Sequence, residues 1–303
     1  MVQFGQYPSP AHTIMHLSDP HLLAGGAELF GTVDTDRALL HSLERLERFG
    51  TRPEAIVVTG DLADRGEPDA YARLKSLVEP VAERLGAELV WVMGNHDERP
   101  EFASILYGEP PTDAPQDRVH DMNGLRVVAL DTSVPGYHHG ELTDGQLEWL
   151  AGVLATPAPH GTIIALHHPP LPTPLELMAI IELRDQWRLA EIVRDTDVRA
   201  ILGGHLHYST HGTFAGIPVS VAAATCYTFD VSAGPDTTAG VYGAHAFNLV
   251  QVYEDRIVHS VVPADDFSQV NVYPADYLAR LARMTAAERT AAFSRKSPPA
   301  DPR

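Results

Sequence analysis

The sequence is poor in cysteine, with Cys226 as the single example among 303 residues. One cysteine cannot form a disulfide within the chain, so the composition gives no sign of an oxidising compartment. The N-terminal stretch has no basic segment followed by a long apolar core, and no apolar run approaches the roughly 20 residues that span a bilayer. We therefore expect no signal peptide, no integral membrane segment and a cytoplasmic location. Cys226 itself is expected to be a small core residue.

Basic residues are also scarce, because 22 lysines and arginines stand against 40 aspartates and glutamates, for a formal net charge of −18. A nucleic-acid polymer is therefore not an expected partner, since binding one usually needs a basic patch. A small anionic substrate would need local positive charge from metal ions, which the 16 histidines and many acidic residues could hold. The alternative is that the acidity only keeps the protein soluble.

Internal repeats are absent, and the chain instead alternates apolar runs with amphipathic stretches up to about residue 207. The apolar runs typical of strands are 12–19, 54–61, 88–93, 162–170 and 199–207. The stretch 34–50 predicts a helix capped by Asp34. Beyond residue 207 the pattern favours consecutive strands joined by short turns. This order predicts a layered α/β domain over residues 1–263.

Residues 264–303 are expected to form a C-terminal extension. Apolar residues partly on one face favour one helix over 275–293, and the proline-rich end from Lys296 is expected to be disordered. Such a helix could dock back on the domain, pair with another subunit or stay loose. A homodimer is one of the arrangements that this leaves open.

Metal-ligand residue types follow five of the apolar runs, at the point where each run ends. The five groups are Asp19-x-His21, Gly60-Asp61, Gly94-Asn95-His96-Asp97, His167-His168 and Gly204-His205-x-His207. In α/β sheets, ligands bind beyond the carboxyl ends of the strands, where several loops converge. In extended backbone, residues i and i+2 point the same way, so each x-spaced pair can face one site. Each glycine lets the chain turn sharply beside a ligand. Each group alone is weak evidence, but their joint occurrence indicates a metal site.

The five groups, in this order, resemble the signature of the calcineurin-like metallophosphoesterases. The matching stretches are SDPH, TGDLADRG, MGNHDE, LHHPP and GGHLH, and the resemblance covers about residues 12–210. The stretches ELVWVMGNHD, LDTSVPG and GHLHYST look like those of bacterial class III cyclic nucleotide phosphodiesterases, the mycobacterial type above all. The resemblance implies a four-layer α/β/β/α sandwich of two mixed β-sheets flanked by helices.

The resemblance also implies a binuclear metal centre. It assigns Asp19, His21, Asp61 and His207 to one metal, and Asp61, Asn95, His167 and His205 to the other. Asp61 is thereby the bridging ligand. Imidazole, carboxylate and amide donors together suit Fe, Mn, Zn or Co rather than Ca. Fe with Mn is the expected pair, with Zn or Co as alternatives.

The chemistry implied is hydrolysis of a phosphate ester. Two metals can lower the pKa of a bridging water and neutralise the phosphate, so that a bridging hydroxide attacks phosphorus in line. By the resemblance, His96 contacts the phosphate and protonates the leaving oxygen, and Asp64 orients its imidazole. The expected substrate-binding residues are Asn95, His96, His138, His139 and Arg65.

Cyclic nucleotides are the expected substrates, either 3′,5′-cAMP or the 2′,3′ isomer. A glycerophosphodiesterase and a broad phosphomonoesterase or protein phosphatase of the same fold are the alternatives. Arg65 is the reason to retain the phosphomonoesterase or protein phosphatase alternative, because it matches the phosphate-binding arginine of the GDxxDRG motif. Outside enzymes, the alternative is a catalytically silent scaffold, although every ligand position is filled.

Three polar residues near the motifs have structural expectations. His16 lies within the first apolar run and is expected to be packed there. His168 is expected to face away from the metals or to orient a ligand. Asp97 is expected to brace its loop or a neighbouring ligand, since metal-binding histidines usually need an acceptor for their second N–H.

Overall fold

The structure is a computed structural model and describes residues 3–234 and 237–296. By its internal contacts the chain divides into a larger unit, residues 10–265, and a smaller one formed by residues up to 9 together with those from 266 onward. The predicted boundary after residue 263 thus falls close to the division after Asp265. The described residues among the first nine group with the C-terminal segment. No helix in the described ranges is long and apolar enough to cross a membrane.

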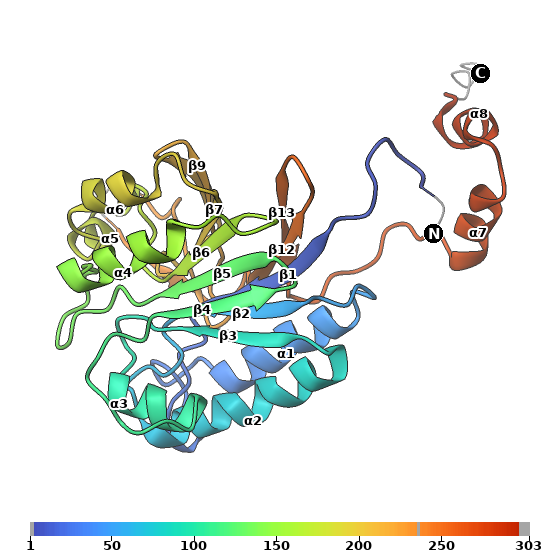
Figure 1. Cartoon of the computed structure of the whole chain (residues 1–303). Helices are drawn as coiled ribbons and strands as arrows, with labels where there is room; N and C mark the ends of the chain where they lie inside the picture. Colours follow the sequence, from blue (N-terminus) through green and yellow to red (C-terminus); the bar gives the residue numbers. More distant parts are fainter. Residues whose placement is uncertain (1–2, 235–236, 297–303) are drawn as a thin grey trace. The chain divides into compact units, whose positions relative to one another are not determined.

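Two large β-sheets form the centre of the larger unit (Figure 1). In order across the first sheet, the strands are β13 (Ile257–Pro263), β12 (Ala246–Val252), β1 (His12–Leu17), β2 (Ala55–Thr59) and β3 (Glu88–Val92). The second sheet has β4 (Arg118–Met122), β5 (Leu125–Leu130), β6 (Thr162–Leu166), β7 (Val198–Gly203), β9 (Ile217–Val221) and β8 (Thr210–Phe214). Both sheets are mixed, since β1 pairs parallel with β2 and antiparallel with β12, and β5 pairs parallel with β6 and antiparallel with β4. A separate two-stranded sheet pairs β10 (Thr228–Phe229) with β11 (Gly240–Val241).

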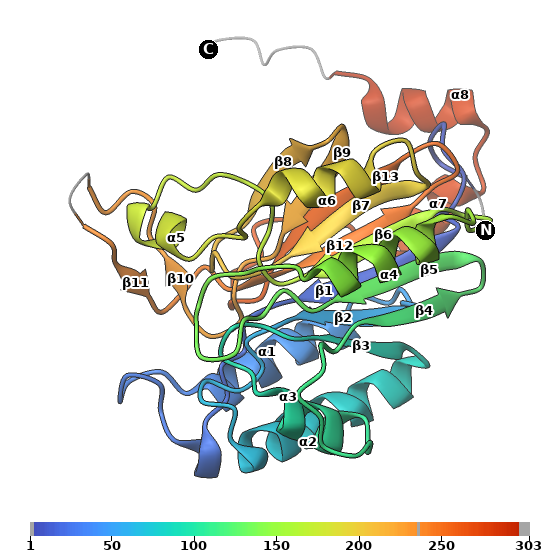
Figure 2. The same cartoon turned by 60° about the vertical axis from the view of Figure 1, so that its left-hand side comes forward.

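Helices cover the outer faces of both sheets (Figures 1 and 2). The helices of the larger unit are α1 (Thr35–Glu47), α2 (Pro68–Leu85), α3 (Arg99–Glu101), α4 (Asp144–Leu154), α5 (Glu176–Ile180) and α6 (Gln186–Val193). Helices α1 and α2 pack on the first sheet, and α4 and α6 on the second. Asp34 caps α1 as predicted, because its side chain accepts a hydrogen bond from the backbone N–H of Arg37.

Alternation along the strands creates three apolar layers. Along β1, Ile14 faces the second sheet, whereas Met15 and Leu17 face α1 and α2. Successive side chains of a strand point to opposite faces, so each central strand contributes to two layers. A third layer lies between the second sheet and its helices. The predicted four-layer α/β/β/α sandwich is confirmed, and its core leaves the ends of the strands free to carry polar groups.

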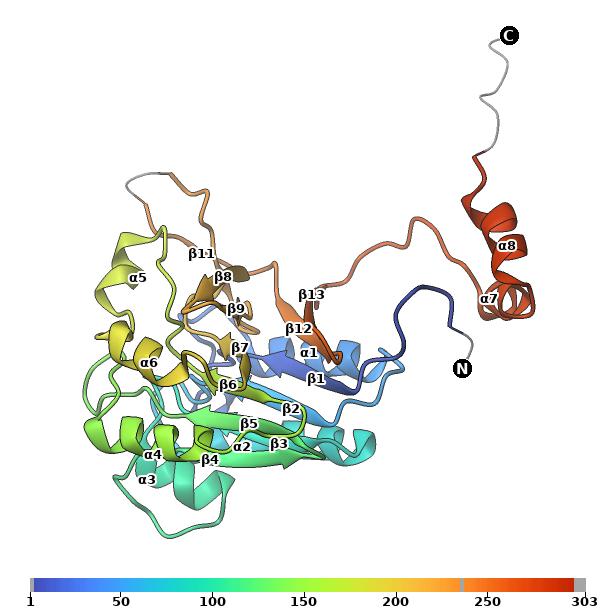
Figure 3. The same cartoon turned by 45° about the horizontal axis from the view of Figure 1, so that its top comes forward.

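The predicted helix over 275–293 is broken in the structure (Figure 3). Helix α7 (Ala275–Ala282) ends, and α8 (Ala286–Arg289) begins and continues as a short π-helical turn over Thr290–Ser294. The Thr285 side chain accepts a hydrogen bond from the backbone N–H of Glu288, and the Glu288 carboxylate accepts one from the backbone N–H of Thr285. This capping box starts a new helix, which the apolar pattern alone does not reveal. The predicted disordered end lies outside the described residues from residue 297 onward.

Candidate metal centre

The seven predicted metal ligands converge at the carboxyl ends of the strands, and both sheets contribute. In chain order they are Asp19 after β1, Asp61 after β2, Asn95 after β3, His167 after β6 and His205 after β7, with His21 and His207 two residues beyond Asp19 and His205. Asp61 Oδ2 lies 3.3 Å from His21 Nε2 and 3.3 Å from His167 Nε2. Asp61 thus stands between ligands from the two sheets, which is the arrangement expected of a bridging carboxylate.

On one side of Asp61, three further donors form the first group. The Nε2 atoms of His21 and His207 lie 3.2 Å apart, and His207 Nε2 is 3.4 Å from Asp19 Oδ1. Ligand atoms of these three residues and Asp61 all lie within 4.8 Å of one another. This is the ligand set that the sequence predicts for one metal.

On the other side of Asp61 lies the second group. His167 Nε2 is 3.0 Å from Asn95 Oδ1 and 3.2 Å from His205 Nδ1. This is the predicted set for the second metal. The fold therefore brings the residues predicted from the sequence together in two adjacent groups.

Each of the four histidines has its other ring nitrogen bonded outside the site. The pairs are His21 Nδ1 with Asp64 Oδ1 at 3.0 Å, His167 Nδ1 with the Thr59 carbonyl at 2.7 Å, His205 Nε2 with the Ile181 carbonyl at 3.0 Å, and His207 Nδ1 with the Tyr227 carbonyl at 3.1 Å. Since carbonyl and carboxylate oxygens only accept, each neutral ring donates outward and turns a lone pair toward the site. Two lone pairs 3.2 Å apart cannot bond to each other. A cation between them satisfies both, so the donors fit a metal.

The charges of the site lead to the same conclusion. Asp19 and Asp61 are buried, and although burial favours their neutral forms, neighbouring histidines hold the pKa of each carboxyl below its usual range. Burial would lower the pKa of His21, but hydrogen bonds to Asp61 and Asp64 raise it to about 10. No lysine or arginine of the described chain lines the cavity above these groups. Buried carboxylates need compensation, and metal ions are the compensation that this ligand set can bind.

The backbone at the ligands is unusual. Eleven non-glycine residues of the described ranges have a positive φ, and five of them are predicted ligands: Asp19, His21, Asp61, His205 and His207. The expectation that the x-spaced pairs are extended is therefore wrong, although both members still reach the site. Such conformations cost about 1–3 kcal/mol each and concentrate at functional sites.

The glycines before the ligands serve close packing more than turning. Only Gly60 has a positive φ among the three predicted turn glycines. A Cβ on Gly60 would lie 2.7 Å from Gly94 Cα, and one on Gly204 would lie 2.7 Å from the Thr59 carbonyl oxygen. The loops after β2, β3 and β7 therefore approach too closely for side chains at these positions.

Asp97 connects two of the ligand loops. Its carboxylate accepts hydrogen bonds from the backbone N–H groups of Leu62 and Gly94 and from the Tyr71 hydroxyl. The predicted bracing role is thus confirmed, because the bonds tie the Asp61 loop to the Asn95 loop. Burial, together with the nearby Asp61, raises the pKa of Asp97 to about 6.

His96 lines the cavity, but its orientation differs from the prediction. Its Nδ1 lies 2.7 Å from the backbone carbonyl of Asp64, whereas the Asp64 carboxylate is 3.6 Å away. That carboxylate instead lies 3.0 Å from His21 Nδ1. Asp64 therefore orients His96 mainly through its carbonyl, and its side chain supports a metal ligand.

The predicted substrate contacts divide into residues that reach the cavity and residues that do not. The cavity has a volume of about 440 Å³ and is lined by Asn95, His96 and His138 among others. His138 Nδ1 lies 2.9 Å from Asn95 Nδ2. His139 turns away, because it is buried and its Nε2 bonds Glu141 at 3.0 Å. Arg65 also does not line the cavity, since its side chain is 72% exposed.

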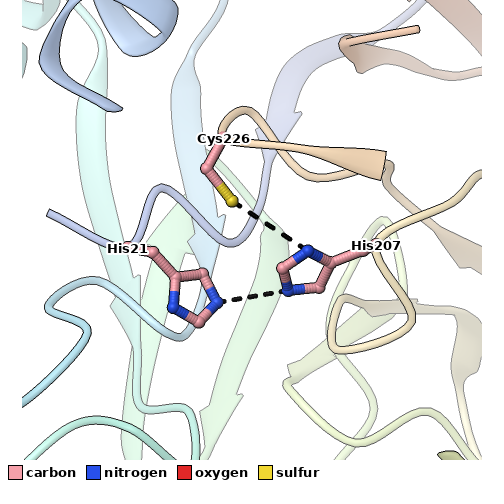
Figure 4. Close-up of side chains that lie close together, drawn as sticks. All are labelled: His21, His207 and Cys226. Atoms are coloured by element: carbon pink, nitrogen blue, oxygen red, sulfur yellow. Dashed lines mark hydrogen bonds between the residues drawn. The ribbon is translucent and has the colours of Figure 1, made fainter. Parts of the chain in front are cut away.

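Two buried side chains near the ligands have structural roles. Cys226 is buried as predicted, and its Sγ lies 3.9 Å from His207 Nδ1, the nitrogen that faces away from His21 (Figure 4). His168 is also buried, with Nδ1 bonded to Thr132 Oγ1 at 2.7 Å and Nε2 to the His138 carbonyl at 3.1 Å. His168 therefore supports the loop that carries His138. His16 is fully buried within β1, as expected.

Sequence reasoning missed the apolar residues of the cavity. They are Phe30, Leu177, Met178, Ile180, Ile181, Tyr227 and Phe229. They come from three separate segments whose loops follow no spacing rule. No pattern in the sequence could have grouped them, whereas the metal ligands each follow a recognisable strand.

Comparisons with known proteins agree with this geometry. The family described as calcineurin-like phosphoesterase matches residues 12–209. A cAMP/cGMP dual specificity phosphodiesterase from Mycobacterium tuberculosis is 56% identical over 275 residues, covering 91% of this chain and 86% of that protein. A probable cyclic nucleotide phosphodiesterase from Rhodococcus erythropolis is 56% identical over 262 residues, covering 86% of this chain and 87% of that protein.

The fold itself recurs in a solved structure. A dimetal phosphatase from Danio rerio superposes with a TM-score of 0.61 at 18% identity, covering 85% of this chain and 98% of that one. At this identity the likeness supports the fold alone. The family match and the two bacterial relatives support an assignment to a protein family as well. The chain therefore belongs to the calcineurin-like phosphoesterase family, whose fold implies a dimetal centre where its histidines and aspartates cluster.

Proposed function

We propose that this protein is a binuclear metal-dependent phosphodiesterase that hydrolyses cyclic nucleotides, with 3′,5′-cAMP as the first substrate and the 2′,3′ isomer as the second. The observation that carries the proposal is the position of Asp61, with a complete donor group on either side. Relatives at 56% identity that are named as cyclic nucleotide phosphodiesterases support the substrate class.

The residues of the site have different roles in the proposed reaction. Two bound metals supply an activated water and neutralise the phosphate charge. Asp19, Asp61 and the four histidines hold them, and Asn95 adds a neutral amide oxygen. His96 donates a hydrogen bond from its Nδ1–H to the Asp64 carbonyl, which leaves Nε2 to protonate the leaving oxygen.

The absence of cationic side chains favours a diester over a monoester. A phosphomonoester brings one more negative charge than a diester, and no lysine or arginine of the described chain lines the cavity. Arg65 was the reason to consider a protein phosphatase, but its side chain is 72% exposed and does not line the cavity. The absence of cationic side chains does not distinguish a cyclic nucleotide from a glycerophosphodiester. The preference for a cyclic nucleotide therefore rests on the two bacterial relatives.

We also propose Fe with Mn as the native metals, with Zn or Co as alternatives, because the mixed donors suit this range of metals. A homodimer and a cytoplasmic location remain predictions.

The proposal is tested with protein reconstituted with Mn and Fe, on 3′,5′-cAMP, bis-p-nitrophenyl phosphate and p-nitrophenyl phosphate. We expect both diesters to be cleaved in preference to the monoester. His96→Ala should lower kcat by about 10²- to 10⁴-fold, the usual contribution of a general acid, while metal content is retained. His139→Ala is the matched control, because His139 lies on a nearby loop but bonds Glu141 outside the cavity.

Three results would contradict the proposal. A metal-loaded protein inactive on all three esters would be a silent scaffold. Loss of both metals in His96→Ala would make His96 a ligand-positioning residue. Preference for p-nitrophenyl phosphate, the monoester, would favour the phosphomonoesterase or protein phosphatase alternative.

A further inference from the structure

The cavity is lined by a wall of apolar residues as well as by the predicted metal ligands. The residues of this apolar wall are Phe30, Leu177, Met178, Ile180, Ile181, Tyr227 and Phe229. Two of them are strongly exposed, with Phe30 at 73% and Ile180 at 70%. Large apolar side chains held together in water indicate a binding surface.

Phe30 stands at the tip of a short, anchored turn. Leu29 and Val33 bond each other through both backbone N–H groups, at 2.9 and 3.0 Å, and both side chains are buried. Phe30 between them has a φ of 55°. A left-handed conformation is rare for a bulky residue, and such strain concentrates at ligand clamps. The turn therefore holds an exposed aromatic ring in a fixed position that folding does not require.

Aromatic rings connect Phe30 to the metal ligands. The ring centroids of Phe30 and Tyr227 lie 5.5 Å apart at an interplanar angle of 69°. Tyr227 in turn lies 4.4 Å from the ring of His207, a predicted metal ligand. Phe229 completes the row, 5.5 Å from Tyr227 and 5.5 Å from His207. A ligand whose phosphate lies at the metal site therefore meets aromatic surface directly beside it.

We propose that the apolar wall binds the nucleobase of the substrate, with Phe30 as the residue on which the base stacks. This inference rests on the proposed function and deepens it. A cyclic nucleotide joins an anionic phosphate to a flat aromatic base, and the cavity joins a metal site to an uncharged aromatic side. Its volume of about 440 Å³ is within the range of small-ligand pockets. Base recognition is by stacking, which every base offers through its π-face.

Recognition of this kind limits the selectivity between bases. The side chains of the wall are apolar apart from the Tyr227 hydroxyl, so few groups can read the edge of a base. An apolar pocket rejects a near-isostere by only about 10- to 200-fold. We expect adenine and guanine nucleotides to be accepted with KM values within about tenfold of each other.

The test compares Phe30→Ala with the wild type by calorimetric titration of the Mn-reconstituted protein with 5′-AMP and, separately, with inorganic phosphate. Loss of one base–aromatic stack typically weakens binding by about tenfold or more. We therefore expect the Kd of 5′-AMP to rise about tenfold and the Kd of phosphate to stay within about twofold. The KM for 3′,5′-cAMP should rise in parallel while kcat changes little.

Two further variants make the result specific. Phe30→Trp should keep the affinity for 5′-AMP within about threefold, because indole offers a larger stacking surface. Phe49→Ala removes a partly exposed phenylalanine that does not line the cavity, so its affinities should equal those of the wild type.

Unchanged 5′-AMP affinity in Phe30→Ala would overturn the inference. So would an equal loss of 5′-AMP and phosphate affinity, because Phe30 would then only support the metal site. If Phe30→Ala instead changes the oligomeric state in gel filtration and leaves 5′-AMP affinity intact, the wall is an interface between copies of the chain. A wild type that cleaves bis-p-nitrophenyl phosphate but not 3′,5′-cAMP overturns the proposed function separately.

Discussion

The two ends of the same β-strands both carry acidic residues and histidines, yet they differ in how the charges are balanced. At the amino ends, Asp197 before β7 accepts two hydrogen bonds from Arg126, both at 3.0 Å. His12 at the start of β1 bonds Glu54 at 2.8 Å. At the carboxyl ends, Asp19 and Asp61 face only histidines. The acid at one end is paired with an arginine, whereas the acids at the other lie among histidines that can bind a metal ion.

The volume of the cavities does not distinguish the carboxyl ends of the strands from the amino ends. A cavity at the amino ends has a volume of about 580 Å³ and is lined by His160, Asp197 and Arg199, whereas the one at the metal site measures about 440 Å³. The Arg199 guanidinium bonds the carbonyls of His160 and Tyr253. Its donors are used to hold the fold together. Unbalanced buried charge therefore identifies a ligand site better than the volume of the space above it.

The largest effect is expected from Asp61→Asn at the carboxyl ends. The change removes the charge that both donor groups share, so metal content should fall and kcat/KM for a diester should drop by at least about a thousandfold. Metal content by mass spectrometry and steady-state rates are the measurements. Full metal content with unchanged activity would show that Asp61 bridges nothing.

Asp197→Ala at the amino ends should affect stability instead of metal binding. Asp197 and Arg126 form a partly buried ion pair, so the substitution should cost about 1–3 kcal/mol, because the Arg126 donors lose their acceptor. Urea unfolding of the metal-free protein should show this loss, and the folded variant should still bind as much metal as the wild type. If metal content falls with Asp197→Ala, the two ends are not independent.

A smaller effect is expected from His16, which is fully buried, and His259, which is partly buried. Burial and the nearby His259 lower the pKa of His16 to about 3, and burial and His211 lower that of His259 to about 4. Since the unfolded chain binds these protons near pH 6.5, it holds more protons than the fold below that pH. Stability should therefore fall as the pH drops from about 6.5 towards 4. His21, whose pKa is raised to about 10, contributes stability that is fully present below pH 6.5 and does not alter this slope.

His259→Gln tests the assignment in metal-free protein. The variant should lose about 1–2 kcal/mol less stability than the wild type between pH 7 and pH 5. Unfolding by urea at the two pH values measures the difference. Identical losses in both proteins would show that His259 is not kept neutral by the fold.

The convergence of the predicted metal ligands could be foreseen from the sequence, because each group follows an apolar run and parallel strands bring their carboxyl ends together. The reasoning was incomplete even there, since the Asp19 and His21 backbones are left-handed and not extended. His138 and His139 are neighbours, yet only His138 reaches the cavity. Contacts with distant segments decide such loop conformations, for example the bond from His168 to the His138 carbonyl. The residues of the apolar wall could not be predicted from the sequence either, because they come from separate segments whose arrangement depends on such distant contacts.

Metal content of the wild type and Asn95→Ala, determined by mass spectrometry after reconstitution with Mn, tests the central claim most directly. Asn95 Oδ1 lies 3.0 Å from His167 Nε2 in the second donor group only. We predict close to two metals per wild-type chain and a clear loss in Asn95→Ala, with diester hydrolysis lost in step. Less than one metal per wild-type chain would contradict a binuclear centre, and the converging histidines would then need another explanation.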